Sequence, residues 1–255
     1  MIDSLDSYTK RQFENELAAQ VGYVINQYVP LVGKRRAFLL GGQSGAGKTT
    51  LHHVLSNEIQ PRPVIINGDE FRKSHPHFAE LNAKYGKEAV DHTSKWSGAM
   101  TEALVDRLSA LGFNLIVEGT LRTSSVPLSS AAFLRERGYA VSLALMAVKP
   151  EISLISCQIR YESMRLAGTT PRATDPKHHM KIVEAIVDNV KELEKSGMFD
   201  EIRLYTRSET CLFPADGEER SASEVLQDVL FGAWTDEEQK HYEHLQAHLE
   251  KLQGL

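Results

Sequence analysis

The chain has 255 residues, 42% of them hydrophobic and 25% charged, which is typical of a folded globular protein with a substantial core. Its formal net charge of −5 provides no overall excess of Lys and Arg for a nucleic-acid backbone or an anionic membrane, so we expect neither partner. The two cysteines, Cys157 and Cys211, are too few and too far apart for a disulfide framework or a zinc site, and they fit a reducing compartment.

The N-terminal region is predicted to be a short polar segment followed by an amphipathic helix. Residues Met1–Lys10 lack the apolar run of a secretory signal, and no stretch approaches the roughly 18 apolar residues of a membrane span, so we expect a cytoplasmic protein. Thr9 and Gln12 form a predicted capping box at the start of the helix, which Pro30 and Gly33 end. The apolar stripe of this helix comprises Phe13, Leu17, Val21, Val24, Ile25 and Tyr28.

Five short apolar runs follow, and each is typical of a buried strand. These runs are Ala37–Leu40, Val64–Ile66, Leu115–Val117, Val141–Val148 and Ile202–Tyr205. Helical segments such as Met100–Leu111 and Ile182–Leu193 lie between them. This alternation predicts an α/β fold with a mostly parallel five-stranded sheet flanked by helices.

The C-terminal region starts with a polar stretch, residues 214–223, which is typical of a surface loop. A second capping box, Thr235 with Glu238, then opens a terminal helix that is expected to pack on the domain or on a partner. The apolar face of this helix comprises Tyr242, Leu245, Leu249 and Leu252. We predict a single domain over residues 1–255, with an N-terminal helix (1–33), an α/β core (34–232) and a C-terminal helix (233–255).

Residues Gly42–Thr49 match the phosphate-binding pattern G-x-x-x-x-G-K-[ST] at every fixed position. The glycines let the backbone approach phosphate groups closely, and the predicted helix that follows offers its positive N-terminal end. Lys48 is expected along the β- and γ-phosphates, with the Thr49 hydroxyl on Mg²⁺. The sequence therefore predicts a P-loop phosphotransferase. The nucleotide-binding residues are Gly42, Gln43, Ser44, Gly45, Ala46, Gly47, Lys48, Thr49 and Thr50.

Two other predicted strands end in a carboxylate beside a glycine. Asp69 follows the strand at 64–66, and Glu118 follows the strand at 115–117. Ligands of parallel sheets lie beyond the carboxyl ends of the strands, so both side chains are expected to face the phosphate site. Asp69 is the candidate base for an acceptor hydroxyl, with capping of a helix near Phe71 as the alternative. Three roles are open for Glu118: it could position Mg²⁺ through water, accept a hydrogen bond from the acceptor substrate, or form a structural salt bridge.

Phosphoryl transfer also needs positive charge around the moving group, and two arginines are candidates. Arg160 lies in a predicted helix and Arg172 in a Pro-containing loop, and from the residues alone a solvated position is the better interpretation for either. Paired histidines occur at three places, but no Cys or carboxylate completes a metal-ligand spacing around them.

Several segments together resemble the zeta-toxin kinases. They are Gly41–Thr49, Asp69 with Phe71-Arg72 and His75-Pro76, Met100–Ala103, Glu118–Arg122, Arg160–Glu162 and Arg172–Thr174. The resemblance spans nearly the whole chain. It implies a toxin that uses ATP and Mg²⁺ to phosphorylate the 3′-hydroxyl of the sugar of UDP-N-acetylglucosamine, thereby blocking cell-wall precursor synthesis. It also implies a small helical antitoxin that blocks the nucleotide site.

The resemblance further implies a role for each matching residue. Lys48 and Thr49 hold ATP and Mg²⁺, and Asp69 is the base. Arg160 and Arg172 brace the transferring phosphoryl group. The implied amino-sugar nucleotide pocket is lined by Glu102, Glu118, Thr120 and Arg122.

The chain departs from the family pattern at Asn67, where members often carry Asp, and at Asp175, which is an extra residue after the Arg172 segment. Neither departure touches a first-line catalytic position, so activity is expected to survive. A P-loop kinase of another small-molecule hydroxyl and a non-catalytic nucleotide-binding module remain as alternatives. A switch GTPase is disfavoured because the sequence has no N-K-x-D guanine motif.

Overall fold

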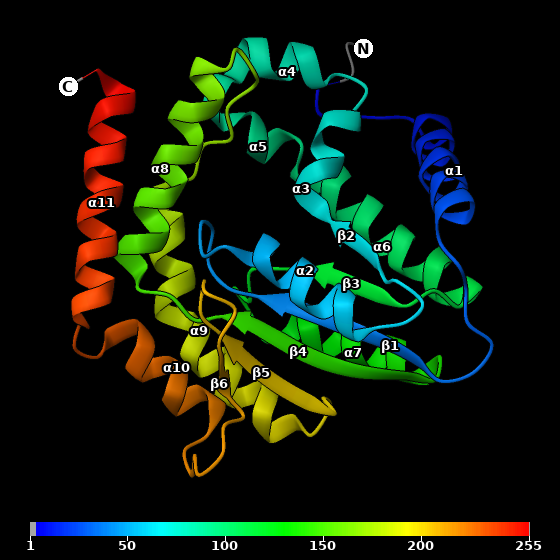
Figure 1. Ribbon diagram of the computed structural model, residues 1–255. Helices are drawn as coiled ribbons and strands as arrows, with labels where there is room; N and C mark the ends of the chain where they lie inside the picture. The colour runs from blue at the N-terminus through cyan, green and yellow to red at the C-terminus, as the bar shows by residue number, and fades with distance from the viewer. Residues whose placement is uncertain (1–3, 255) are drawn as a thin grey trace.

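The computed structural model describes residues 4–254 (Figure 1). Residues 1–3, which begin the predicted polar segment, and residue 255 lie outside the described part of the chain. The strands are β1 (Arg35–Gly41), β2 (Val64–Asn67), β3 (Leu115–Glu118), β4 (Tyr139–Met146), β5 (Glu201–Tyr205) and β6 (Cys211–Phe213). They form one sheet in the order β2-β3-β1-β4-β5-β6. The first five strands are parallel, and β6 is antiparallel to β5.

The predicted α/β fold with a mostly parallel sheet is confirmed, and each of the five expected strands is present. The sixth strand is an addition that the hydrophobic pattern did not predict. β6 is only three residues long, begins at the exposed Cys211, and pairs with β5 alone at the edge of the sheet. A strand this short and exposed lacks the apolar run by which the other five were found.

The described residues also form eleven α-helices and two 3₁₀ turns. The helices are α1 (Lys10–Gln27), α2 (Lys48–Glu58), α3 (Gly68–Phe71), α4 (Phe78–Tyr85), α5 (Ala89–His92), α6 (Ser94–Leu111), α7 (Ser125–Glu136), α8 (Pro150–Leu166), α9 (Pro176–Ser196), α10 (Ala222–Phe231) and α11 (Asp236–Gln253). The 3₁₀ turns are η1 (Arg72–Ser74) and η2 (Gly86–Glu88). Both predicted capping boxes are present, at Thr9 and at Thr235, and a third lies at Ser221.

The sheet is covered on both faces because successive strand residues point to opposite sides. In β1, Ala37 and Leu39 pack into the larger core with residues of α6, α7, α9 and α10. Phe38 and Leu40 point the other way, into a second core with residues of α2 and α8. Figure 1 shows α2 in front of the sheet and α7 behind it. Burial on both faces explains why the inner strands are continuous apolar runs.

The two terminal helices pack on the rest of the chain. Helix α1 lies on α6 and buries Leu17 and Val24, while Ile25, predicted for the same apolar stripe, is 54% exposed. Helix α11 lies beside α8, where Tyr242 and Leu245 contact the second core (Figure 1). No helix of residues 4–254 combines the length and apolarity needed to cross a membrane.

Candidate active site

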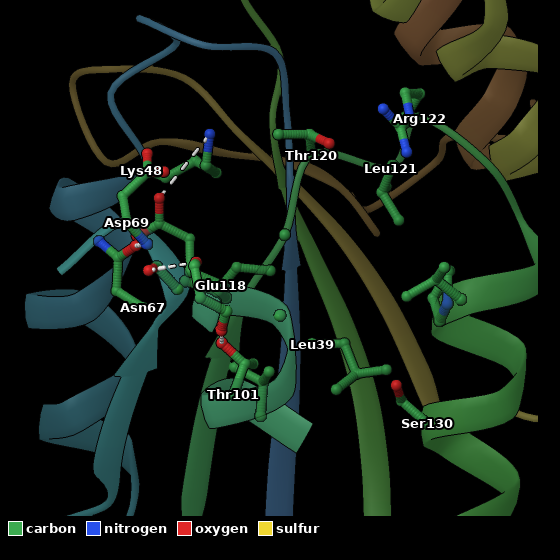
Figure 2. A pocket seen from close by; sticks show the side chains of 18 of the residues that line it. Leu39, Lys48, Asn67, Asp69, Thr101, Glu118, Thr120, Leu121, Arg122 and Ser130 are labelled. Atoms are coloured by element: carbon green, nitrogen blue, oxygen red, sulfur yellow. Dashed lines mark hydrogen bonds and ion pairs between the residues drawn. The ribbon is translucent and has the colours of Figure 1, made fainter. Parts of the chain in front are cut away.

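A cavity of about 990 Å³ lies beyond the carboxyl ends of β1, β2 and β3. Figure 2 shows side chains from the phosphate loop, the β2 and β3 ends, and helices α6 and α7 lying around it. Residues that the sequence placed in the site and that line the cavity are Ser44, Gly45, Lys48, Thr49, Asp69, Glu102, Glu118, Thr120, Arg122, Arg160 and Arg172. Tertiary structure therefore brings all the predicted catalytic and acceptor residues to one space.

The phosphate loop connects β1 to α2 and needs glycine for steric reasons. Gly47 has φ +98° at the N-cap of α2, and Gly45 has φ +76°, both in the region that side chains disfavour. A Cβ at Gly45 would also overlap the Ser153 carbonyl oxygen of α8. The loop therefore packs tightly against α8, and its shape depends on that contact.

Gln43 belongs to the predicted nucleotide-binding residues, but its side chain faces away from the cavity. It is fully buried, and its Nε2 donates to the Val148 carbonyl at 2.9 Å and to Ser153 Oγ at 3.2 Å. Ser153 Oγ in turn lies 2.9 Å from Nε2 of the buried His179. These contacts fasten the loop to α8 and α9, so any contact of Gln43 with phosphate is left to its backbone.

Lys48 is nearly buried at the start of α2. Its Nζ donates to the carbonyls of Gly42 at 3.0 Å and Gln43 at 3.3 Å, and it lies 3.9 Å from Glu118 Oε1. Burial lowers the pKa of Lys48, and the Glu118 carboxylate opposes that shift. A desolvated ammonium beside the loop carbonyls is suited to exchange them for phosphate oxygens.

Glu118 ends β3, the strand next to β1, and its carboxylate faces the phosphate loop. Its Oε2 lies 3.1 Å from Nε2 of His52 on α2, within ion-pair distance. Both of these atoms are buried and have no hydrogen-bond partner among residues 4–254. Glu118 therefore lies within ion-pair distance of both Lys48 and His52, which agrees with its salt-bridge alternative and places its carboxylate beside the phosphate loop.

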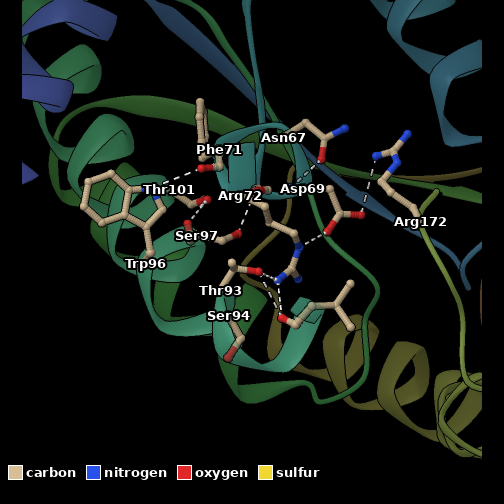
Figure 3. Close-up of polar contacts among 12 residues, drawn as sticks. Asn67, Asp69, Phe71, Arg72, Thr93, Ser94, Trp96, Ser97, Thr101 and Arg172 are labelled. Carbon is tan, nitrogen blue, oxygen red and sulfur yellow. Dashed lines mark hydrogen bonds and ion pairs between the residues drawn. The ribbon is translucent and has the colours of Figure 1, made fainter. Parts of the chain in front are cut away.

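Asp69 lies at the start of α3, where two arginines approach its carboxylate (Figure 3). Arg72 Nε donates to Oδ1 at 2.8 Å, and Arg172 Nη1 lies 4.0 Å from Oδ2. Burial raises the pKa of Asp69, but the hydrogen bond and charge of Arg72, with Arg172 and Arg160, outweigh it and hold the pKa below its usual value. The carboxylate is thus ionised and fixed in orientation.

The helix-capping alternative for Asp69 is wrong, because another residue caps that helix. Asn67 Oδ1 accepts from the Asp69 backbone N–H at 3.1 Å, so the cap of α3 is Asn67 (Figure 3). The second departure from the family pattern, Asp175, likewise caps α9 by accepting from the Lys177 N–H at 3.0 Å. Asn and Asp both serve well as N-caps.

The two candidate arginines come from the elements expected of them, a helix and a loop, and meet at the cavity. Arg160 lies on α8, and its Nη2 donates to Thr174 Oγ1 at 3.3 Å, which ties the helix to the loop that carries Arg172. The Arg160 Nε is buried and has no hydrogen-bond partner in the described part of the chain. Both arginines therefore line the cavity, and 37% of the Arg172 side chain is also exposed to solvent.

The far side of the cavity has a polar rim and an apolar floor. Glu102 and Arg122 are exposed at the rim, and the partly buried Thr120, two residues after the end of β3, also lines it. The floor between α6 and α7 is lined by Leu39, Val105, Val117 and Phe133. The sequence predicted the rim but not the floor, because its residues come from four different elements.

Three contacts of this site have no counterpart in the predicted set. Arg72 holds Asp69 and also donates to the Val90 carbonyl at 2.6 Å, and its place three residues after Asp69 on a helix was a usable signal. His52 faces Glu118, and Arg207 contacts the phosphate loop from the β5–β6 turn. Neither of these last two carries a local sequence signal.

The strand order, the phosphate loop between β1 and α2, and the polar residues at the strand ends define a P-loop phosphotransferase fold. The zeta toxin family model matches residues 22–218. The chain belongs to the zeta toxin family.

Individual relatives agree with this assignment. The chain is 43% identical to Toxin PezT of Streptococcus pneumoniae over 92% of its length and 93% of that protein. It is 39% identical to Toxin zeta of Streptococcus pyogenes over 81% of its length and 72% of that protein. A solved structure from the PezAT chromosomal toxin–antitoxin system of Streptococcus pneumoniae matches with a TM-score of 0.88 and 39% identity, covering 99% of this chain and 100% of that one.

A more distant structure shares only the fold. The AvrRxo1-ORF1:AvrRxo1-ORF2 complex matches with a TM-score of 0.62 at 12% identity, covering 98% of this chain and 87% of the matched one.

Proposed function

We propose that the protein is a cytoplasmic toxin kinase that transfers the γ-phosphoryl group of ATP to the 3′-hydroxyl of the sugar in UDP-N-acetylglucosamine. The observation that carries the proposal is one cavity in which Lys48 and Thr49 lie opposite an oriented Asp69 carboxylate, with Arg160 and Arg172 alongside. A pure nucleotide sensor has no need of this second set of charges.

The proposed reaction assigns each group a step. The acceptor oxygen bonds to the γ-phosphorus, the bond from that phosphorus to the β-bridging oxygen breaks, and ADP leaves. The hydroxyl proton passes to Asp69, which the neighbouring arginines keep ionised and in place. Arg160 and Arg172 supply positive charge to the transferring group, and Lys48 supplies it to the β- and γ-phosphates.

The residues present also suit a magnesium ion. Thr49 and Glu118 both line the cavity, and a hydroxyl and a carboxylate are oxygen ligands of the kind that Mg²⁺ takes. Mg²⁺ is commonly held by one or two protein oxygens together with substrate phosphates, so a larger cluster of ligands is not needed. Thr49 and Glu118 would hold the ion, which would neutralise charge on the β- and γ-phosphates.

The acceptor is proposed to lie against the rim formed by Glu102, Thr120 and Arg122, with Glu118 at its inner end. Arg122 supplies the positive charge that a diphosphate requires. The names of the relatives, Toxin PezT and Toxin zeta, support a toxin role for this chain. The matched PezAT toxin–antitoxin structure supports a small antitoxin protein as its partner.

A product assay tests the acceptor. Purified protein is incubated with ATP, Mg²⁺ and UDP-N-acetylglucosamine, and the products are weighed by mass spectrometry. We expect the sugar nucleotide to gain the mass of one phosphate, with no gain for the Lys48→Ala variant. Phosphate on a different hydroxyl compound would instead identify another small-molecule kinase, and no transfer despite ATP binding would favour the binding module.

Toxicity and partnership are tested separately. Expression of the wild type in a growing bacterium is expected to arrest growth, and Lys48→Ala is the matched harmless control. Co-expression of a small helical protein encoded beside the toxin gene is expected to restore growth. A wild type that transfers phosphate in vitro but leaves growth unchanged would contradict the toxin assignment alone.

A further inference from the structure

Arg207 lies on a rigid turn between β5 and β6, outside the cavity. The Thr206 backbone N–H donates to the Thr210 carbonyl at 3.0 Å, and the Thr210 N–H donates to Thr206 Oγ1 at 3.2 Å. The Glu209 N–H closes the turn by donating to the Thr206 carbonyl at 3.2 Å. A turn closed by three hydrogen bonds presents Arg207 in a fixed position.

The Arg207 guanidinium holds the back of the phosphate loop. Its Nε donates to the Ala46 carbonyl at 3.2 Å, and its Nη2 donates to the Gly45 carbonyl and, at 2.9 Å, to Ser156 Oγ of α8. The same stretch of α8 packs on Gly45, where a Cβ would lie 2.7 Å from Cys157 Sγ. Arg207 therefore fastens the loop to a helix that already supports it.

These hydrogen bonds set the direction of the loop N–H groups. Each peptide unit is planar, and its carbonyl and N–H point in opposite directions. Because the Ala46 carbonyl is directed at Arg207, the Gly47 N–H of the same peptide unit points to the opposite side. The Gly45 carbonyl is fixed in the same way, and the Ala46 N–H of that unit donates to the Gln43 carbonyl at 3.1 Å within the loop. The Gly47 N–H is thereby left on the side away from Arg207, and phosphate-binding loops use N–H groups that face the anion.

The charge of Arg207 is not offset by a carboxylate. No Asp or Glu oxygen in residues 4–254 forms an ion pair with its guanidinium, whereas Arg203, four residues earlier on β5, pairs with Glu58 and Glu201 at 2.6 Å each. A guanidinium remains protonated even when partly buried. Arg207 thus places an unpaired positive charge directly behind the phosphate cradle.

We propose that Arg207 is a positioning residue of the nucleotide site: it holds the peptide planes of the phosphate loop in their phosphate-binding orientation and adds positive charge behind the triphosphate. This inference rests on the proposed function only in requiring that the loop binds a nucleotide. It is independent of the acceptor.

Calorimetric titration with a non-hydrolysable ATP analogue and Mg²⁺ tests the assignment without any acceptor. Arg207→Met is expected to raise the Kd for the analogue by about tenfold or more, because the loss of one hydrogen bond from a charged group weakens binding by about that factor. Arg207→Lys keeps the charge but loses the planar fork, so its Kd is expected between those of the wild type and Arg207→Met. It also serves as the second variant where Arg207→Met folds poorly.

Arg203→Met is the matched control, because it removes the same type of side chain from the strand that leads into the turn and breaks two ion pairs away from the loop. It is expected to lower the unfolding temperature while leaving the Kd unchanged. An Arg207→Met or Arg207→Lys protein that binds like the wild type overturns the assignment, as does weakening in Arg203→Met equal to that in Arg207→Met. A wild type that binds no analogue overturns the nucleotide claim itself.

Discussion

At the amino ends of β1, β3 and β4, buried polar groups are paired with one another, whereas at the carboxyl ends several have no partner. Asn114 accepts from the Arg36 N–H and donates to the Pro61 carbonyl, both at 2.9 Å. The Tyr139 hydroxyl donates to the Phe113 carbonyl at 2.6 Å. These bonds join the strand starts to the preceding loops, so this end is built for stability.

The carboxyl end has the opposite character. Oxygen or nitrogen atoms of Gln43, His52, Glu118 and Arg160 are buried there and lack hydrogen-bond partners in the described chain. At the amino end, Arg35 Nε is also buried without a hydrogen-bond partner in the described chain. The Arg35 guanidinium instead lies over the Tyr139 ring, 5.8 Å from the ring centroid. Unpaired buried groups cost stability. Of these residues, Glu118 and Arg160 line the cavity, where a bound ligand can offer partners, whereas the Gln43 side chain faces away from it.

The largest expected effect is at Lys48. Lys48→Ala removes the charge that lies along the phosphates, so we expect phosphoryl transfer to fall by about a thousandfold or more. Stability should not fall with it, because burial of the ammonium disfavours its charged form. Mass-spectrometric product rates and thermal unfolding measure the two quantities, and a large fall in unfolding temperature would contradict the comparison of the two ends.

Asp69→Asn is expected to lower kcat by about 10²- to 10⁴-fold, because the amide cannot accept the hydroxyl proton. The fold should be preserved, since the cap of α3 is made by Asn67 and remains. Glu70→Gln removes a neighbouring carboxylate of α3 and serves as the control. Near-normal turnover in Asp69→Asn would remove Asp69 from the role of base.

Arg72→Met is expected to lower kcat about tenfold at neutral pH, because the Asp69 carboxylate loses its orientation. The pH profile carries the sharper test. Burial raises the pKa of Asp69 and Arg72 is the largest influence that lowers it, so removing Arg72 raises this pKa. The acid limb of kcat should therefore move to higher pH, and Arg72→Lys should move it less. An unchanged acid limb would show that Asp69 does not titrate in the reaction.

The smallest expected effect is at the amino end, where Tyr139→Phe should cost about 1–2 kcal/mol of unfolding free energy and leave kcat unchanged. Burial raises the pKa of Tyr139 from 10.0 to about 12, so the folded state favours the protonated hydroxyl. Its contribution is present below pH 10 and is lost as the pH rises toward 12. Denaturant unfolding at neutral and alkaline pH measures this, and a loss of activity would break the separation between the two ends.

The sequence alone predicted those parts of the protein that are made by residues close together in the chain. The phosphate loop is contiguous from Gly42 to Thr49, and the boxes at Thr9 and Thr235 depend on residues three positions apart. The inner strands were found because burial on both faces makes them apolar runs. The polar residues that follow β2 and β3 could then be placed near the loop, because parallel strands end at the same edge.

Tertiary structure alone decided the contacts between distant segments. Arg207 and Ala46 are 161 positions apart, and Asn114 and Arg36 are 78 apart, so no local pattern connects them. The exposure of Ile25 was likewise set by how α1 lies on α6 rather than by its own periodicity. Local spacing fixes which groups can bind a phosphate, but the packing of α8 and the β5–β6 turn against the loop fixes how those groups are aimed.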